Sequence, residues 1–472
     1  MLFNSYEFIF IFLPIVLIIY FNLNRFGKYN LSKGWLVIAS LYFYSYFHKS
    51  YLILIVSSIL FNYFIGYLLN KKENNRKVYL ILGLIFNLGT LGYFKYYDFF
   101  VKNINIVFKT DFNLINILLP LGISFFTFQQ LSFVIDSYNG KSLHYDFLSY
   151  ALFVTFFPQL IAGPIVTPSE MLPQFKDKKN KLINYENMNR GLYIFSIGLA
   201  KKVILADSIA SFANAGFDKM QSLTFVEAWL SSLSYTLQLY FDFSGYCDMA
   251  MGIALMFNIL LPLNFNSPYK SLDIQEFWQR WHMTLGRFMK NYLYIPLGGN
   301  KKGELKTYGN LWIVFLVSGL WHGAGWNFII WGAMHGLGIL VHRIWHKTGH
   351  KLNKFLAWFI TFNLVNILWI FFRAKNFKGA VKVLNGMCNI STIKITKLYF
   401  EKCFGVLSPM GHLEILYLIL IISVIICFFF KNTFYLSKKK LNIKGKILYI
   451  SFLFSFSILF LERMATFLYF NF

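Results

Sequence analysis

Residues 308–342 read YGNLWIVFLVSGLWHGAGWNFIIWGAMHGLGILVH. Two apolar runs, 308–320 and 323–342, meet at a break around Gly319–Gly323 that carries His322. Such runs predict helices in a lipid bilayer, where each backbone must satisfy its own hydrogen bonds. Bent backbone at membrane depth is tolerated where it lines a cavity, and a histidine there is costly unless it works or is paired. The stretch therefore predicts a helical membrane protein with a candidate functional histidine.

The composition of the whole chain supports the same class. Of 472 residues, 57% are hydrophobic and 14% are charged, against about 45–50% and about 25% in soluble domains. So few charges could not cover the surface of a soluble protein. This excludes a cytosolic globular enzyme, a secreted disulfide scaffold and a disordered chain. Of the four cysteines, Cys388 and Cys403 flank a polar stretch and could pair only in an oxidising compartment.

Apolar runs recur along the chain, and no linker, repeat or low-complexity tract divides it. We therefore expect one membrane domain, residues 1–472, with an all-α polytopic fold of about 11–13 transmembrane helices plus re-entrant and interfacial helices. Besides the two quoted above, the runs cover residues 5–23, 33–48, 51–69, 78–94, 114–136, 147–162, 190–209, 223–240, 247–263, 355–372, 413–430 and 447–469.

The net charge of +25 comes from Lys and Arg clusters between the apolar runs. This pattern is typical of cytoplasmic loops, which lie near anionic lipid headgroups. It places residues 342–354 and 431–446 in the cytoplasm. Because topology accounts for the charge, we expect membrane lipids and no nucleic acid as partners.

A polar segment, residues 264–300, separates the apolar runs on either side. In it, charged residues such as Arg280 and Arg287 alternate with aromatic residues such as Trp281. An amphipathic helix of this kind suits the membrane interface or a funnel lined by protein. The sequence Tyr294-Ile-Pro-Leu-Gly-Gly299 then ends any helix.

Several motifs in order along most of the chain resemble the membrane-bound O-acyltransferase family. Within the family, they resemble the branch of the alginate O-acetyltransferase membrane subunit and its peptidoglycan-acetylating relatives. The D-alanyl-transferring branch shares the two histidine motifs but differs around Tyr294–Gly299. The motifs are Pro120–Gln129, Asp136–Tyr138, Pro158–Pro164, Arg280–His282, Tyr292–Asn300, Trp321–Trp326 and Phe371–Ala374.

The resemblance implies helices that form a central funnel with a histidine at its floor. It places the family's invariant histidine at His322 and its second histidine at His282. Independently, an alcohol that attacks a thioester needs a base near neutral pH, which histidine provides. We expect His322 to be that base or a transient acyl carrier, and His282 to orient the donor. Interfacial anchoring is the alternative for His282, and a structural hydrogen bond is the alternative for His322.

Five further residues are expected to support these histidines: Arg280, Trp281, Trp321, Trp326 and His335. His335 follows His322 by 13 positions, which on one straight helix is about 20 Å of rise, so we expect no shared site.

Three basic residues, Lys201, Lys202 and Arg287, are candidates for binding the phosphates of the donor. Snorkelling is the alternative for the two lysines. For Asp242 and Asp248, we expect structural roles as caps or as partners of arginine or histidine.

No metal site is expected. His335, His342 and His346 share one helical face, but residues 342–346 lack the glutamate of a zinc-protease helix.

These observations predict an enzyme, an O-acetyltransferase of the bacterial cytoplasmic (inner) membrane. It would take acetyl from acetyl-CoA as a substrate, with no bound cofactor, and pass it toward an exported polysaccharide. The family often uses an extracytoplasmic SGNH-type acyltransferase, and this chain has no Gly-x-Ser-x-Gly elbow, so a partner is expected. The alternatives are D-alanyl transfer toward teichoic acids and a non-enzymatic transporter or channel.

Overall fold

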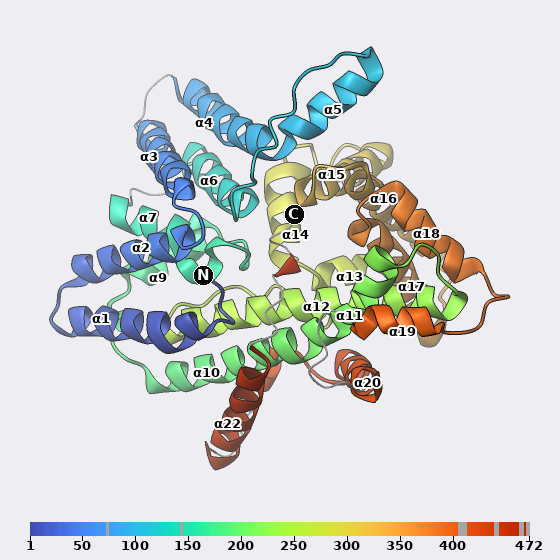
Figure 1. Ribbon diagram of the computed structural model, residues 1–472. Coiled ribbons are helices and arrows are strands. Elements are labelled where there is room, and N and C mark those ends of the chain that lie inside the picture. The colour runs from blue at the N-terminus through green and yellow to red at the C-terminus, as the bar shows by residue number, and fades with distance from the viewer. Residues whose placement is uncertain (72–74, 142–144, 405–412, 439–442, 462–466, 469–472) are drawn as a thin grey trace. The chain divides into compact units, whose positions relative to one another are not determined.

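The computed structural model describes residues 1–71, 75–141, 145–404, 413–438, 443–461 and 467–468. These residues form helices and no strand (Figure 1). They divide into two compact units: residues 1–195 with 246–262, and residues 196–245 with 263–472. Helices α10 (Tyr185–Ala200) and α12 (Phe225–Met256) continue from one unit into the other. The expectation of a single membrane domain stays a prediction.

The first unit is held together by polar contacts between its helices as well as by apolar packing. Asn62 on α3 and Asn87 on α4 exchange side-chain hydrogen bonds of 3.1 and 2.6 Å. Amide pairs of this kind join helices where water is scarce. The helices of this unit are α1 (Leu13–Arg25), α2 (Tyr29–Ser45), α3 (Ser50–Asn70), α4 (Arg76–Leu91), α5 (Tyr97–Phe108), α6 (Ile123–Tyr138), α7 (Phe147–Thr155), α8 (Phe157–Leu160) and α9 (Pro168–Lys176).

The second unit carries both candidate histidines. Its helices are α11 (Asp207–Asn214), α13 (Ile274–Arg280), α14 (Met283–Met289), α15 (Glu304–His322), α16 (Trp326–Lys347), α17 (Lys354–Arg373), α18 (Phe377–Cys388), α19 (Lys397–Phe404), α20 (Leu413–Phe429), α21 (Thr433–Lys438) and α22 (Ile443–Leu459). Short π- or 3₁₀-helical turns join many of the helices in both units: Glu7–Phe12, Gly92–Tyr96, Lys178–Lys181, Lys201–Ala206, Ala215–Lys219, Pro268–Lys270 and Lys290–Tyr294.

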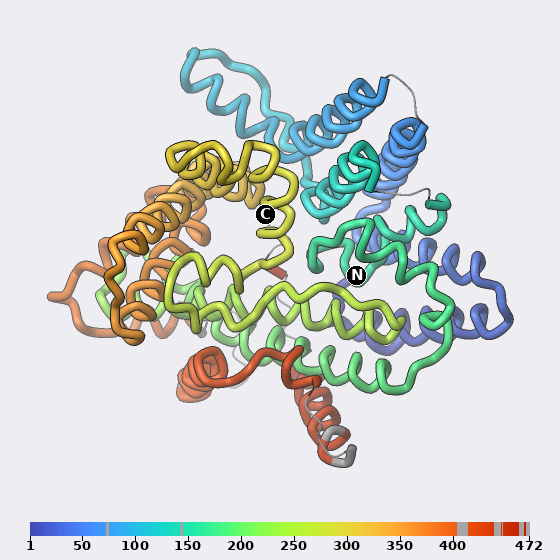
Figure 2. Tube along the Cα trace, turned by 180° about the vertical axis from the view of Figure 1, so that it is seen from behind, coloured from blue at the N-terminus to red at the C-terminus, as the bar shows by residue number. Residues whose placement is uncertain are grey.

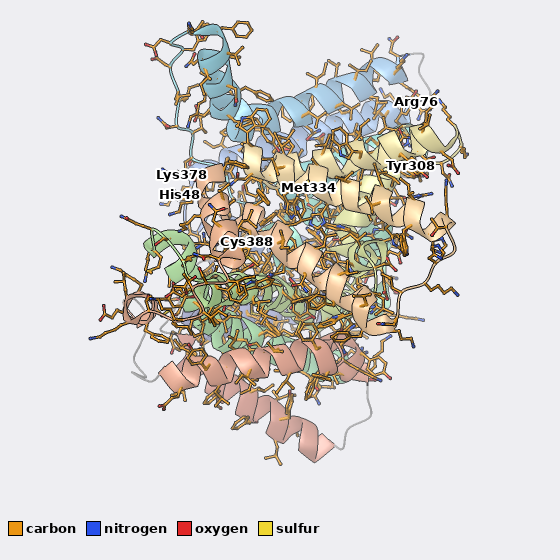
Figure 3. The ribbon with its side chains drawn as sticks, turned by 90° about the vertical axis from the view of Figure 1, so that its right-hand side faces the viewer. His48, Arg76, Tyr308, Met334, Lys378 and Cys388 are labelled. Atoms are coloured by element: carbon orange, nitrogen blue, oxygen red, sulfur yellow. The ribbon has the colours of Figure 1, made fainter. Side chains whose placement is uncertain are left out.

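Helices α15, α16 and α17 follow one another in the chain and pack side by side (Figure 2). Tyr308 on α15 and Met334 on α16 mark the first two, and Lys378 and Cys388 mark the ends of α18 (Figure 3). Asn353 caps α17 by accepting a hydrogen bond of 2.8 Å from the Leu356 N–H.

The break after His322 is a tight turn between the two antiparallel helices α15 and α16.

Five described helices or helix runs are long and apolar enough to cross a membrane: Glu7–Arg25, Ser50–Asn70, Arg76–Phe108, Trp326–Lys347 and Lys354–Arg373. Two shorter apolar helices cover Glu414–Phe429 and Ile447–Leu459. Together with the absence of strands among the described residues, these helices confirm an all-α polytopic membrane protein. The total of about 11–13 crossings and the central funnel stay predictions.

One expected boundary is wrong. The apolar runs 223–240 and 247–263 suggest two elements, whereas residues Phe225–Met256 form the single helix α12. Asp242 and Gly245 interrupt the hydropathy pattern there without interrupting the helix. All four cysteines are free, so Cys388 and Cys403 do not pair.

Candidate active site

The turn between α15 and α16 is built on glycines. A Cβ atom on Gly319 would lie 2.3 Å from the Phe328 carbonyl oxygen, and one on Gly332 would lie 2.4 Å from that of Phe315. Because only glycine fits these positions, the two helices approach closely, as small residues allow in membrane proteins. The sequence Gly323-Ala-Gly325 reverses the chain just after His322.

His322, the last residue of α15, is buried with 3% of its surface exposed. Aromatic rings surround its imidazole: the ring centroids of Trp331 and Phe372 lie 5.2 and 5.1 Å away, nearly edge-on. Trp331 comes from α16 and Phe372 from α17. The close packing of the hairpin therefore places this histidine in a dry, aromatic environment.

His282 lies between α13 and α14, with 1% of its surface exposed. Its backbone has φ of 45° and ψ of 49°, a left-handed conformation that costs a non-glycine residue free energy. Backbone hydrogen bonds from Met283 N to Asn264 O (3.0 Å) and from Asn266 N to Arg280 O (2.9 Å) hold the chain on both sides. Such maintained strain is typical of functional positions.

Asn264 determines which nitrogen of His282 carries hydrogen. The Asn264 Oδ1 atom accepts hydrogen bonds from Thr284 N (3.2 Å) and Thr284 Oγ1 (2.9 Å), and it lies 3.1 Å from His282 Nδ1. Since that oxygen only accepts, Nδ1 is protonated and Nε2 keeps its lone pair. Burial lowers the pKa of His282 to about 3, so the ring is neutral at physiological pH.

The fold brings the two histidines together although 40 positions separate them. Their ring centroids lie 6.3 Å apart, and the Trp321 ring lies 6.0 Å from that of His282. Imidazole nitrogens in a dry site can accept and return a proton without competition from water. The chemical roles of the two residues stay proposals.

Of the expected supporting residues, Trp281 and His335 belong to the aromatic shell beside the site. The Trp281 ring packs 5.0 Å from Phe265, which itself stacks near His282. His335 is completely buried, and its Nδ1 accepts a 3.3 Å hydrogen bond from Trp278 Nε1. The straight-helix assumption for His335 is wrong, because the chain reverses between His322 and His335. Trp331 on α16 consequently contacts both His322 and His335, whose ring centroids lie 5.2 and 4.8 Å from its own.

Two other supporting residues lie elsewhere. Arg280 forms an ion pair of 2.7 Å with Glu276, one turn earlier on α13, and donates to the Asn266 carbonyl at 3.2 Å. Trp326 begins α16 with 59% of its surface exposed. The roles of Arg280 and Trp326 as supports of the histidine pair stay predictions.

The three candidates for donor phosphates lie on two elements: Lys201 and Lys202 are neighbours in the turn Lys201–Ala206, and Arg287 is on α14. The Lys202 ammonium is buried and lies 2.7 Å from carboxylate oxygens of both Asp207 and Asp242. It therefore neither snorkels nor presents a free charge, and Asp242 is a structural partner of a lysine, not of the arginine or histidine expected. Lys201 and Arg287 are half-buried, on Lys201–Ala206 and α14 respectively.

Sequence reasoning missed Asn264, Trp331 and Phe372. The i, i+4 spacing of Trp331 and His335 on one helix was a usable signal. Phe372 lies within the Phe371–Ala374 motif, whereas Asn264 offered no signal, since it meets His282 only through the fold. Across the described part of the chain, no three His, Cys, Asp or Glu side chains are placed to hold a metal ion.

The role of Asn264 can be tested by substitution. We expect Asn264→Ala to lower the acyl-transfer rate about tenfold or more, because each buried donor left without an acceptor costs about 1–3 kcal/mol. Asn264→Asp keeps the acceptor but places a negative charge beside His282, which raises the histidine pKa. On the acidic side of the pH–rate profile, the rate of this variant should therefore begin to fall at a higher pH than the rate of the wild type. An unshifted profile would contradict the placement of His282 beside the reacting groups.

The chain is similar to several known acyltransferases. The model of the MBOAT, membrane-bound O-acyltransferase, family matches residues 40–374. The peptidoglycan O-acetyltransferase of Helicobacter pylori is 48% identical, over 100% of this chain and 98% of the relative. The probable alginate O-acetylase AlgI of Pseudomonas aeruginosa is 39% identical, over 89% and 81%. The teichoic acid D-alanyltransferase of Streptococcus thermophilus is 28% identical, over 53% and 68%.

Proposed function

The chain belongs to the membrane-bound O-acyltransferase family, and on that premise we propose that it passes acetyl from cytoplasmic acetyl-CoA toward an exported polysaccharide. The observation that carries the proposal is the buried pair His282 and His322, whose rings lie 6.3 Å apart. The membrane is the bacterial cytoplasmic membrane.

In the proposed reaction, His322 acts as the base. It takes the proton of the acceptor hydroxyl as the oxygen attacks the thioester carbonyl, and the carbon–sulfur bond then breaks. The imidazolium returns the proton to the departing thiolate, so that CoA leaves as the thiol. His282, held by Asn264, orients the donor. If His322 instead carries the acetyl group transiently, its nitrogen makes the first attack.

The whole-chain match to a relative named peptidoglycan O-acetyltransferase supports peptidoglycan as the polymer, ahead of alginate. We expect an extracytoplasmic SGNH-type acyltransferase to complete the transfer. D-alanyl transfer ranks lower, because the relative with that activity in its name is 28% identical over 53% of the chain.

The test is purified protein in vesicles with acetyl-CoA labelled in the acetyl group. We expect free CoA to appear only when the partner enzyme and peptidoglycan fragments are present on the side of the vesicle membrane opposite to acetyl-CoA. Label found on the protein itself would identify the relay. Transfer from a D-alanyl carrier protein without CoA release from acetyl-CoA would favour the other branch, and neither reaction would favour a transporter.

A further inference from the structure

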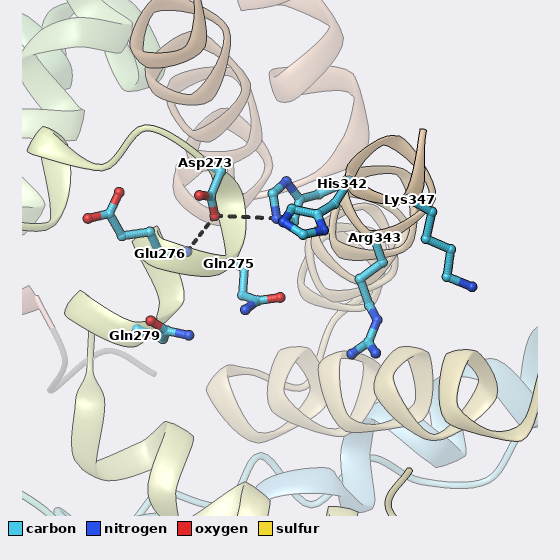
Figure 4. Close-up of a pocket in the computed structure, with 8 residues that line it drawn as sticks. Asp273, Gln275, Glu276, Gln279, His342, Arg343 and Lys347 are labelled. Atoms are coloured by element: carbon cyan, nitrogen blue, oxygen red, sulfur yellow. Dashed lines mark hydrogen bonds and ion pairs between the residues drawn. The ribbon is translucent and has the colours of Figure 1, made fainter. Parts of the chain in front are cut away.

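A polar pocket of about 560 Å³ lies in the second unit, away from the histidine pair (Figure 4). Its walls are α13, with Gln275 near the start of the helix and Gln279 near its end, and the last turns of α16, with Arg343 and His346. Every residue that lines it is polar or charged. Its size is typical of sites for small molecules, although its polarity exceeds that of most.

The carboxylates of the pocket are already engaged. Asp273 accepts a 2.7 Å hydrogen bond from the Glu276 N–H and lies 3.6 Å from His342 Nε2 (Figure 4). Glu276 holds Arg280 at 2.7 Å. Their charges are therefore partly compensated by neighbours, which reduces their effect on an anion in the pocket.

Arg343 is different. Among the described residues, none forms a hydrogen bond or ion pair with its half-buried guanidinium. The neighbouring Lys347 bonds to Glu304 instead, and this bond lowers the pKa of the Glu304 carboxyl. The pocket thus offers two amides, an imidazole and a planar cation, whose charge interacts with Glu304 without a described ion pair. Guanidinium binds phosphate with two hydrogen bonds, and glutamine amides match the edge of adenine.

Both walls lead toward the histidine site. Helix α13 begins at the pocket and ends at Arg280, two residues before His282. On α16, His342 of the pocket follows the buried His335 by seven residues, about 10 Å of helix. The basic loop after α16, which includes Lys351, is expected to be cytoplasmic. A ligand in the pocket would be on the donor's side, within reach of the histidines for a long flexible arm.

We propose that this pocket binds the phosphorylated adenosine diphosphate of the acyl-CoA donor, with Arg343 on the phosphates and Gln275 and Gln279 at the adenine. The inference rests on the proposed function and adds the location of the donor. It replaces Lys202, whose ammonium is already neutralised, as the phosphate anchor.

The test measures binding of CoA to the full chain in detergent by titration calorimetry. We expect Arg343→Gln to weaken CoA binding about ten- to hundredfold, the usual effect of a lost hydrogen bond to a charged group. Gln275→Ala on the opposite wall should weaken it less. Lys351→Gln is the matched control: it removes one positive charge from the loop that follows α16, outside the pocket, and should leave binding unchanged. Because these residues are half-buried or exposed, the variants should keep the wild-type melting temperature.

A second donor separates binding from structure. Acetyl-pantetheine carries the same thioester without the nucleotide, so its turnover should be equal in wild type and Arg343→Gln. Equal CoA affinity in wild type and Arg343→Gln would overturn the inference, as would an equal loss with both donors. If either of these overturning results is obtained while the wild type still transfers acetyl from acetyl-CoA, the proposed function stands and only the assignment of the pocket fails. If wild type neither binds CoA nor transfers acetyl, the proposed function itself fails.

Discussion

Replacing His322 with alanine is expected to lower the rate of acetyl transfer by about 10²–10⁴-fold, the usual contribution of a positioned general base. The residue ends α15 in a buried, aromatic environment, 6.3 Å from His282 between ring centroids. Release of CoA from acetyl-CoA in the presence of acceptor measures the effect.

His322→Gln is the matched control for packing. Glutamine keeps a polar side chain of similar volume but cannot accept the proton at neutral pH. We expect it to be as inactive as His322→Ala and closer to wild type in melting temperature. Recovery of most activity in His322→Gln would mean that the histidine has a structural role. Wild-type activity in His322→Ala would contradict the catalytic assignment altogether.

The fold class was predictable because apolar runs of membrane length leave only helices as an option. The break after His322 was also readable, from its glycines. The continuous helix α12 was not, because Asp242 interrupts the hydropathy pattern. Its charge is neutralised by Lys202, 40 positions earlier, and pairing over that distance leaves no mark in a local pattern.

The two histidines were predictable from motifs, whereas their surroundings were not. Asn264 reaches His282 across 18 positions through a left-handed turn that sequence patterns do not specify. His335 was misplaced because the two helices were treated as one. On one straight helix, His322 and His335 would be about 20 Å apart. Because the chain turns at Gly323–Gly325, both residues instead contact Trp331.

The buried cluster of Lys202, Asp207 and Asp242 carries the largest expected effect on stability. One ammonium lies 2.7 Å from two carboxylates, and the Leu468 N–H donates to the other oxygen of Asp242 at 2.9 Å. We expect Lys202→Met to destabilise the protein by about 3–5 kcal/mol, since removal of one partner leaves uncompensated buried charge. Unfolding of the detergent-solubilised chain in denaturant measures this loss.

Comparison with partner substitutions makes the prediction specific. Asp242→Asn leaves one lysine facing one carboxylate, so it should lower the free energy of unfolding clearly less than Lys202→Met does. The triple variant Lys202→Met, Asp207→Asn, Asp242→Asn removes every charge, and it should recover part of the stability lost in the single variant, because neutral replacement of a whole buried ion cluster is often tolerated. A Lys202→Met protein of wild-type stability with weakened CoA binding would contradict the structural role and restore Lys202 as a donor ligand. The ion contacts argue for the opposite result, because an ammonium that already balances two buried carboxylates has little charge left to attract a phosphate.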